Sequence, residues 1–384
     1  MDIVANKALL FKAQNPNIIL DTIPKSKAVS DDEVVVYWGI RESQVLNKLG
    51  YKKTPSPIKR DYKWQGKFKP FDHQIETSSF LTLHKRACCF NEQGTGKTAS
   101  VIWAADYLMT IGEVKRVLVI CPLSIMSSAW LTDLFSCAMH RTASICHGTH
   151  KKRQKILDEG AEFVVINYDG VEIVANEIAK GGFDLIVVDE ANAYKNTSTR
   201  RWKVLNKLAQ QTSYLWMLTG TPASQSPVDA FGLAKLINPE NTPRFAGRWR
   251  EMVMQRVSQF TFIPRPQAKT LVHRVLQPAI RYTKEECLDL PEITYTTREV
   301  PLTPQQNKYY KLMRQELIVN AAGEDITMVN AATAMNKLLQ LSGGAVYSDE
   351  GETISFNVKP RMAVLKEIIE ESSQKVIVFV PFRH

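Results

Sequence analysis

The sequence of 384 residues lacks any uninterrupted apolar run near the roughly 18 residues that a membrane-spanning helix needs. Its first residues, Met1 to Lys7, lack the basic start and apolar run of a secretory signal. Its six cysteines form no CxxC pair and no regular framework, which favours buried, reduced thiols in a reducing compartment. No internal repeat or low-complexity segment occurs. The sequence therefore predicts an intracellular globular protein that does not enter a membrane.

Charge is the compositional feature that points toward a class of partner. The chain has 49 basic and 39 acidic residues, which gives a formal net charge of +10. Such an excess is typical of proteins that bind polyanions such as nucleic acids, but it also serves solubility alone. Composition leaves both interpretations open, so the choice between them depends on the motifs.

From Phe71 onward, short β-rich apolar runs alternate with segments of helical periodicity. The runs expected to form strands are Ala87–Phe90, Val117–Cys121, Ala143–Cys146, Phe163–Asn167, Leu185–Val188 and Tyr214–Leu218. Alternating strand and helix units predict an α/β fold in which a parallel sheet is covered by helices on both faces. Ligands of such sheets bind at the carboxyl ends of the strands, and the motifs described next fall there.

A glycine-rich segment, NEQGTGKT from Asn91 to Thr98, follows the first of these strands and begins a helix. This order of strand, loop and helix is the setting of a phosphate-binding loop. Backbone N–H groups of this loop are expected to turn toward the phosphates, and the residues expected to bind nucleotide here are Gly94, Thr95, Gly96, Lys97 and Thr98. Lys97 is expected to reach the β- and γ-phosphates, and the Thr98 hydroxyl to ligate Mg²⁺. Asn91 stands where the strict GxxxxGK[ST] pattern has its first glycine, so the alternative is a chance glycine-rich turn.

Two adjacent carboxylates, Asp189 and Glu190, end the apolar run Leu185–Val188. Such a pair suits a metal-and-water site, in which Asp189 holds Mg²⁺ and Glu190 polarises the attacking water. Taken alone, the pair could equally be a helix N-cap followed by a first-turn acid. Beside the phosphate loop, it predicts a catalytic set of Lys97, Asp189 and Glu190.

These two segments, with those around them, resemble the motifs of superfamily-two helicases, above all the Swi/Snf branch of duplex-DNA translocases. The similar segments are Lys69–Gln74, Gly94–Thr98 (motif I), Val117–Ser124 with Trp130 (motif Ia), Ile166–Tyr168, Asp189–Asn192 with Lys195–Asn196 (motif II), Leu218–Pro222 (motif III), His273–Pro278 with Ile280–Lys284 and Leu290–Pro291, Pro301–Gln306 with Tyr309, and Lys375–Val380 (motif IV). The resemblance spans residues 68 to 384. It implies a RecA-like P-loop fold that uses ATP and Mg²⁺.

Further site residues follow from the resemblance alone. It implies that Gln74 contacts adenine and that motif III couples hydrolysis to DNA movement. The residues that it assigns to DNA binding or to coupling are Pro122, Ser124, Asn167, Tyr168, Asn192, Thr219, Gly220 and Thr221.

Two features depart from the family pattern. Asn192 occupies the position of a histidine that normally helps to couple the nucleotide site to motif III, although an Asn side chain can still donate a hydrogen bond there. The chain also ends before motifs V and VI, and motif VI supplies arginine fingers that are worth about 10³–10⁵ in rate. A missing C-terminal half or a partner is expected to supply them, so this chain alone is expected to be weakly active or inactive.

The resemblance and the local patterns together predict five regions. They are a small N-terminal α+β accessory domain (1–50), a basic linker (51–67), the RecA-like ATP-binding lobe one (68–240), a helical inter-lobe region (241–345) and the incomplete start of a second RecA-like lobe (346–384). Basic residues interleaved with aromatics predict that the linker is an extended arm, which either contacts a phosphate backbone or is a solvated tether. In the last region, Lys375–Val380 is expected to form a strand with too few neighbours to bury both faces.

The function that these features favour is an ATP-dependent DNA helicase or translocase of the Swi/Snf type, which moves on or remodels duplex DNA. Two alternatives stay open: a nucleotide-gated DNA-binding half-motor with little ATPase activity, and a strand-separating or annealing helicase. The expected partner is DNA, duplex before single-stranded, and no membrane. A role in replication, recombination or repair is expected, in the cytoplasm of a bacterial cell or a phage-infected host, or in the nucleus of a eukaryote.

A dense Cys/His cluster is formed by Cys137, His140, Cys146, His147 and His150. Its spacing, C-x₂-H-x₅-C-H-x₂-H, is not a common zinc pattern. The strand expected at Ala143–Cys146 would also send successive side chains to opposite faces. We therefore expect no metal site in this segment.

Overall fold

The computed structural model describes the whole chain except residues 224, 259–260, 290, 324–327, 348–351 and 383–384. By its internal contacts the chain divides into two compact units, Met1–Leu290 and Pro291–His384. No helix in the described part of the chain is both long and apolar enough to cross a membrane. Each unit is described by itself below.

A seven-stranded sheet forms the centre of the first unit, and every pair of neighbouring strands in it is parallel. In sheet order its strands are β13 (Ala279–Ile280), β5 (Arg86–Cys89), β10 (Tyr214–Leu218), β9 (Leu185–Val188), β6 (Val117–Cys121), β8 (Phe163–Asn167) and β7 (Ala143–Cys146). The six strands expected from the sequence are confirmed, with β5 shifted by one residue. The seventh, β13, lies in a stretch that was expected to be helical, and that expectation was wrong there.

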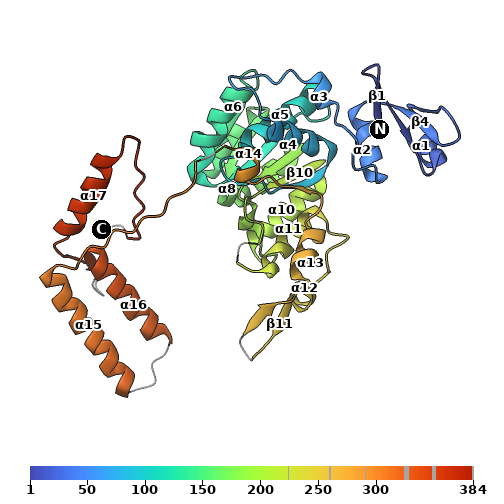
Figure 1. Ribbon diagram of the computed structural model, residues 1–384. Coiled ribbons are helices and arrows are strands. Elements are labelled where there is room, and N and C mark those ends of the chain that lie inside the picture. Colours follow the sequence, from blue (N-terminus) through green and yellow to red (C-terminus); the bar gives the residue numbers. More distant parts are fainter. Residues whose placement is uncertain (224, 259–260, 290, 324–327, 348–351, 383–384) are drawn as a thin grey trace. The chain divides into compact units, whose positions relative to one another are not determined.

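Alternate residues of each strand supply two separate apolar cores, one on either face of the sheet. In β6, for example, Leu118 and Ile120 lie in one core, whereas Val117 and Val119 lie in the other. Helices cover both faces, as Figure 1 shows: α4 (Asp72–Leu83), α5 (Lys97–Thr110) and α6 (Thr132–Cys137) contribute to one core, and α7 (His150–Asp158), α9 (Ala175–Lys180), α10 (Arg200–Gln211) and α11 (Ala230–Ile237) to the other. The expected parallel sheet between two helical layers is therefore confirmed.

Shorter helical segments follow three of the strands and shape the loops at their carboxyl ends. They are η1 (Leu123–Ile125) and η2 (Met126–Leu131) after β6, α8 (Tyr168–Ile173) after β8, and η3 (Ala191–Tyr194) after β9. η2 is a π-helix, a form found frequently at functional sites.

The N-terminal part of this unit has its own antiparallel sheet of four strands, ordered β1-β2-β4-β3. Its elements are β1 (Asp2–Val4), β2 (Ala8–Lys12), α1 (Pro16–Thr22), β3 (Ser26–Ala28), β4 (Glu33–Tyr37) and α2 (Ile40–Lys48). The sequence predicts a strand at Glu33–Trp38 and a helix at Glu42–Leu49, close to β4 and α2, but it does not indicate the other three strands, which are only three to five residues long. Gln44 of α2 donates hydrogen bonds to the Thr82 carbonyl (2.8 Å) and to the Tyr214 hydroxyl (3.0 Å), which ties this small sheet to the large one.

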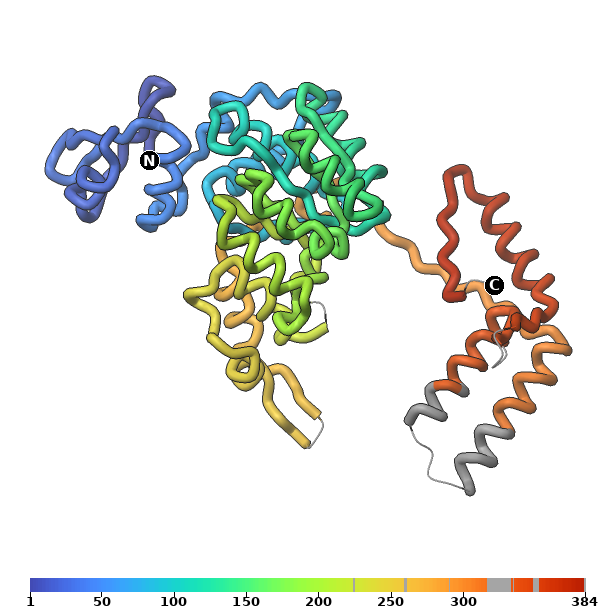
Figure 2. The backbone as a smooth tube through the Cα atoms, turned by 180° about the vertical axis from the view of Figure 1, so that it is seen from behind, coloured from blue at the N-terminus to red at the C-terminus, as the bar shows by residue number. Residues whose placement is uncertain are grey.

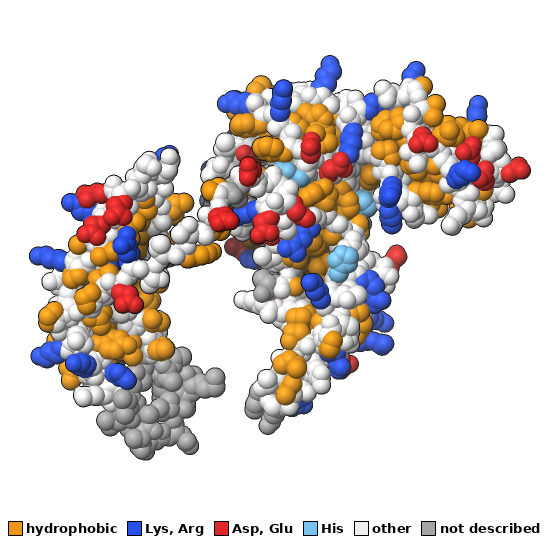
Figure 3. Space-filling model, in the orientation of Figure 1, with side chains coloured by type: hydrophobic (Ala, Val, Ile, Leu, Met, Phe, Trp, Pro, Cys, Tyr) orange, Lys and Arg blue, Asp and Glu red, His pale blue; other side chains and the backbone are white. Residues whose placement is uncertain are grey.

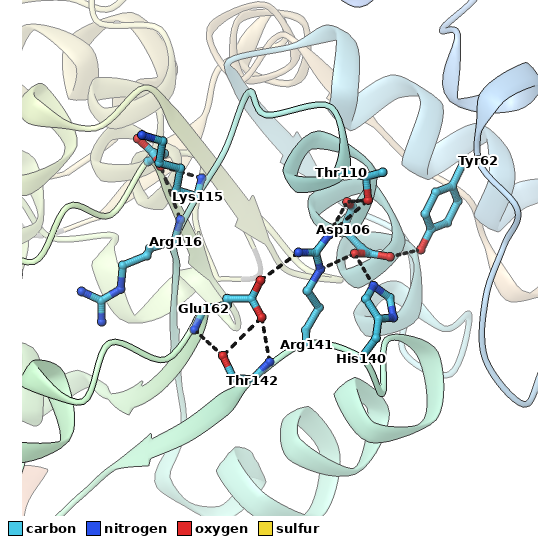
Figure 4. Close-up of polar contacts among 10 residues, drawn as sticks. Tyr62, Asp106, Thr110, Lys115, Arg116, His140, Arg141, Thr142 and Glu162 are labelled. Carbon is cyan, nitrogen blue, oxygen red and sulfur yellow. Dashed lines mark hydrogen bonds and ion pairs between the residues drawn. The ribbon is translucent and has the colours of Figure 1, made fainter.

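The segment expected to be an extended arm is instead packed against the large sheet. It contains the short helix α3 (Ile58–Asp61), and Ile58 and Tyr62 are buried in one of the two main cores. The Tyr62 hydroxyl donates to Asp106, a fully buried carboxylate that also accepts from Arg141 (Nε, 2.6 Å) and bonds to His140 (Figure 4). The arm is not free because its aromatic and apolar residues gain more by burial than by solvation.

After β10 the chain forms η4 (Pro227–Asp229), α11, α12 (Ala246–Val253), a hairpin of β11 (Met254–Arg256) and β12 (Phe262–Pro264), α13 (Ala268–Val275), and α14 (Lys284–Cys287) beyond β13. Figure 1 shows the β11–β12 hairpin projecting beyond α12 and α13, away from the large sheet. The hairpin was not expected, since this region has mostly helical periodicity.

The second unit consists of α15 (Pro304–Gly323) and α16 (Met328–Gly343), which Figures 1 and 2 show side by side, the hairpin of β14 (Ala345–Tyr347) and β15 (Thr353–Ser355), and α17 (Lys359–Glu371). The expected strand at Lys375–Val380 was wrong: no strand is formed there, and Phe379 is 89% exposed. A β-rich sequence needs a neighbouring strand for its backbone hydrogen bonds, and β14 and β15, the strands in the described part of this unit, pair with each other instead.

Candidate nucleotide site

Three segments singled out in the sequence come together at the carboxyl edge of the large sheet. The loops that contain motifs I, II and III follow β5, β9 and β10, and β10 lies directly between the other two strands. Parallel register places Leu218 opposite Cys89, and Met217 opposite Val188. The sheet therefore brings residues 91–98, 189–192 and 219–221 to one edge, as expected from their places after the strands.

The phosphate-loop segment has the backbone of an anion-binding turn. Gly94 and Gly96 have φ values of 85° and 74°, which favour glycine, and a Cβ at Gly96 would lie 2.0 Å from the Gln74 amide nitrogen. Lys97 and Thr98 begin the 14-residue helix α5, whose first N–H groups have no intrahelical acceptors. Thr95 is buried in the loop, and Lys97 and Thr98 are half-buried at the helix start.

Lys97 points back over this loop. Its ammonium donates to the carbonyls of Asn91 (2.8 Å) and Glu92 (3.1 Å). These acceptors are neutral and part-buried, so the lysine is held beside the loop by bonds that an anionic phosphate oxygen can replace with stronger ones.

Asn91, the departure from the strict pattern, is a buried cross-link. Its amide nitrogen donates to the Thr77 hydroxyl (2.8 Å), and its amide oxygen accepts from the Tyr282 backbone N–H (3.1 Å). Glu92 N–H in turn donates to the Tyr282 carbonyl (2.9 Å). The loop is thereby fastened to α4 and to the chain that follows β13, which a glycine at this position could not do.

The segment expected to read adenine lies against the same loop. Gln74 is buried: its amide oxygen accepts from the Phe71 N–H (2.9 Å), and its nitrogen lies 3.5 Å from the Gly96 carbonyl. His73 bonds to the Thr95 carbonyl (2.8 Å), and its ring stacks with Phe71, which is 59% exposed. Sequence reasoning chose Gln74 and passed over Phe71, the exposed flat ring of this group.

Asp189 is held by donors that the sequence did not reveal. Its Oδ2 accepts from the Trp130 indole N–H (2.9 Å), and its Oδ1 accepts from the Glu190 backbone N–H (2.9 Å). Burial raises the pKa of Asp189 above its ordinary 3.8, while the Trp130 hydrogen bond opposes the shift. The signal that could have found this contact is Trp130 itself, since a buried indole N–H requires an acceptor.

Glu190 has a left-handed backbone (φ 47°, ψ 56°), which is uncommon for a residue with a side chain and turns the chain sharply after β9. Burial, and then the adjacent Asp189 charge, raise the pKa of Glu190 above 4.5. A carboxylate destabilised in this way is a better proton acceptor than an exposed one.

Tyr168, which the resemblance placed among DNA-facing residues, instead holds the backbone of the Asp189–Glu190 pair. Its hydroxyl donates to the carbonyls of Asp189 (2.6 Å) and Glu190 (3.2 Å), and burial raises the pKa of that hydroxyl. Its neighbour Asn167 is also engaged, because its side-chain oxygen accepts from Arg153 (3.1 Å). Pro122 and the exposed Ser124 follow β6 at the same edge.

A direct hydrogen bond joins motif II to motif III. The Asn192 amide donates to the Thr221 carbonyl (2.7 Å) and lies 3.2 Å from its hydroxyl. Thr221 N–H donates to the Thr219 hydroxyl (3.2 Å), and Thr219 N–H donates to Cys89 of β5 (3.0 Å). Gly220 lies next to the backbone of Asn91, so this chain of contacts returns to the phosphate loop.

The side chains of the Cys/His cluster have separate partners. His140 bonds to Asp106 and His150 to Glu177, and Cys137 and Cys146 are buried. Within the described residues, no group of three or more His, Cys, Asp or Glu side chains is placed to hold a metal ion.

Known proteins resemble this chain in sequence and in fold. The "Putative protein p41" of Acyrthosiphon pisum secondary endosymbiont phage 1 is 26% identical over 334 residues, covering 82% of this chain and 72% of that protein. The "Uncharacterized ATP-dependent helicase YqhH" of Bacillus subtilis is 24% identical over 45% of this chain and 30% of its own length.

Among solved structures, the Sulfolobus solfataricus SWI2/SNF2 ATPase core in complex with dsDNA has a TM-score of 0.51 at 23% identity, over 80% of this chain and 65% of that one. The chain thus spans about two thirds of that core and less than a third of the Bacillus helicase. At this identity the structural likeness shows the fold. The sequence model of the SNF2-related domain matches residues 73–343, which is well over half of the chain, and the chain therefore belongs to the SNF2-related family.

Proposed function

We propose that this chain carries the ATP-hydrolysing site of a Swi/Snf-type translocase that moves on duplex DNA. The observation that carries the proposal is the convergence of the phosphate loop, the Asp189–Glu190 pair and residues 219–221 on one edge, joined by the Asn192–Thr221 hydrogen bond. Names of relatives support it, since they include ATP-dependent helicases and the "ISWI chromatin-remodeling complex ATPase ISW1" of Saccharomyces cerevisiae. The five regions expected from the sequence are part of this proposal.

ATP binds with its phosphates at the start of α5. Lys97 exchanges its two carbonyl acceptors for β- and γ-phosphate oxygens, and the loop N–H groups around Gly94 and Gly96 complete the cradle. The Thr98 hydroxyl and the Asp189 carboxylate are hard oxygen donors of the kind that suit Mg²⁺, whose chemistry here is to neutralise phosphate charge. Gln74 and the exposed Phe71 ring lie beside this loop, where adenine is expected.

Glu190 accepts a proton from the water that attacks the γ-phosphate. The pKa of the Glu190 carboxyl is raised, which brings it closer to the pKa of an effective general base at neutral pH. The hydrogen bond from Asn192 to Thr221 then transmits any movement of the 189–192 segment to the loop after β10. An amide in place of the usual histidine is sufficient for this contact.

DNA is held mainly through its phosphates, along the loops after β6 and β8 and near residues 219–221. The net charge of +10 supports duplex DNA as the partner, and so does the dsDNA bound in the complex of the Sulfolobus core. The phage relative supports a location in the cytoplasm of a bacterial cell or phage-infected host.

Mg²⁺-dependent ATP hydrolysis, with and without duplex DNA, tests the proposal. We expect weak DNA-stimulated turnover in the wild type, since the chain lacks motif VI, loss of that turnover but retained ATP binding in Glu190→Gln, and loss of ATP binding in Lys97→Ala. Glu159→Gln, which removes an exposed carboxylate at the end of α7, is the matched control. ATP binding that does not depend on Lys97 would refute the site. Lys97-dependent binding without turnover in the wild type would instead support a nucleotide-gated DNA-binding half-motor.

A further inference from the structure

One strongly basic surface of the first unit lies outside every segment that the motifs assign to nucleotide or DNA. Residues 244–274 include seven Arg and Lys residues and one acidic residue, Glu251. Their net charge of +6 is more than half of the +10 carried by the whole chain. These residues form α12, the β11–β12 hairpin and α13, and their described part is called the basic hairpin surface below. Figure 3 shows Lys and Arg side chains gathered over this part of the unit.

This surface is fixed to the large sheet by an apolar underside. Trp249 is fully buried and its indole donates to the Pro227 carbonyl (3.1 Å). Val253 of α12, with Ala268 and Val275 of α13, is buried in the same core. Because the apolar faces of both helices point inward, their cationic side chains are held outward on a rigid support.

Four of these seven cations have no carboxylate partner in the part of the chain that the structure describes. Arg244, Arg248, Lys269 and Arg274 are exposed and form no ion pair with any carboxylate among the described residues. Arg250 lies over the Phe262 ring, 4.1 Å from its centroid, a contact that orders the guanidinium and leaves its hydrogen-bond donors to solvent. Keeping so many like charges together costs folding free energy, a cost that a polyanionic partner would offset.

The composition and the shape favour DNA phosphates as that partner. Six of the seven cations are arginine, whose planar fork matches phosphate oxygens in pairs. At about 1.5 Å per residue, α12 is about 12 Å long, and at about 3.3 Å per residue each hairpin strand adds about 10 Å. Over about 20 Å of axis a duplex presents on the order of ten phosphate charges, so a cationic surface of this length suits a linear polyanion.

We propose that the basic hairpin surface is a second duplex-binding site, which binds the DNA backbone away from the carboxyl edge of the large sheet. This inference rests on the proposed translocase function and adds an anchor to it. Exposed apolar side chains on the hairpin, Val257 (61%) and Ile263 (46%), lie where a two-stranded ribbon can enter a groove while the arginines hold the flanking phosphates.

Salt-dependent duplex binding tests the anchor. The test variant changes Arg248, Arg250, Lys269 and Arg274 to Gln in the full chain. The control changes the same number of exposed, scattered lysines to Gln, namely Lys7, Lys27, Lys180 and Lys311, so that both variants lose four charges. Because each phosphate contact contributes a slope of about −0.9 to log K against log salt, the test variant should lose about 2–4 from that slope. Its affinity should fall at least about tenfold at about 0.1 M salt, with the control within about twofold of the wild type.

A second measurement localises the contact directly. A photo-crosslinking amino acid at Val257 should label duplex DNA at least about tenfold more than the same group at Val29, which is exposed to a similar extent (61% and 57%) on the small N-terminal sheet. Two results together would overturn the anchor and leave the motor proposal standing. The test and control variants would have equal duplex affinity and equal slopes of log K against log salt, and the cross-linker at Val257 would label DNA no more than the one at Val29. A wild-type chain that binds ATP through Lys97 but binds no duplex would overturn both.

Discussion

The indole of Trp130 offers a sharp test of how the Asp189 carboxylate is held. In Trp130→Phe an aromatic ring is kept, but the indole N–H and its hydrogen bond to Asp189 Oδ2 (2.9 Å) are lost. Trp103→Phe is a matched control, because that residue is equally buried (1% against 0%) and its indole donates to a neutral acceptor, the Gln65 carbonyl (3.0 Å). The two substitutions remove the same atoms from the same core.

The difference between the two variants isolates the charge of the acceptor. A hydrogen bond to a charged group contributes about 1.5–3 kcal/mol and one between neutral groups about 0.5–1.5 kcal/mol, so Trp130→Phe should cost about 1 kcal/mol more at pH 7. That excess exists only while Asp189 is ionised. It should therefore shrink as the pH falls through the raised pKa of Asp189 toward its unfolded value of 3.8.

Urea denaturation followed by circular dichroism, at several pH values, measures both quantities. If the two variants lose equal free energy of unfolding at every pH, the indole contributes packing only. The inference that Trp130 positions a charged Asp189 would then be wrong.

Three further substitutions probe the same edge of the sheet. Glu190→Gln should slow hydrolysis about 10²–10⁴-fold and yet raise thermal stability at pH 7, because a group with a raised pKa stabilises the fold only at low pH; the gain should vanish below about pH 4 in melting curves. Asn91→Gly completes the strict phosphate-loop pattern but removes two buried hydrogen bonds, so it should destabilise the chain by about 1–3 kcal/mol in denaturation, and unchanged stability would contradict the cross-link. Asn192→Ala should leave ATP affinity within about twofold and lower DNA-stimulated turnover about 2- to 10-fold, as expected for one lost hydrogen bond; equal turnover would show that the Thr221 contact does not couple.

Much of the sheet could be predicted because its order follows from local patterns. The run of four apolar residues in β9 and its neighbours is long enough to specify a buried strand, and parallel pairing then brings their carboxyl ends to one edge. β13 could not be predicted, because only two residues form it and its parallel partner β5 lies nearly 200 residues earlier in the chain. Lys375–Val380 shows the converse, since strong β propensity without a partner gave no strand.

The sequence indicated which residues of the proposed site lie together, but not the side chains that support them. A short motif indicates that Asp189 and Glu190 stand together, since adjacency in sequence is adjacency in space. It does not indicate that Trp130 and Tyr168, which are 59 and 21 residues away along the chain, meet them through an indole and a phenol. Such contacts depend on how the loops after β6 and β8 fold over the sheet edge.

The supports explain how two neighbouring acids can be kept away from solvent, with Asp189 buried and Glu190 half-buried. Burial makes both carboxylates poorer anions, and their mutual repulsion adds to the shift at Glu190. The Trp130 hydrogen bond opposes the rise in the pKa of Asp189, and a hydrogen bond from Gln93 opposes the rise in the pKa of Glu190, whereas the Tyr168 hydroxyl donates to the backbone carbonyls of both residues. The two carboxylates therefore have different hydrogen-bond partners, which is consistent with the different roles proposed for them, Asp189 as a Mg²⁺ ligand and Glu190 as the proton acceptor.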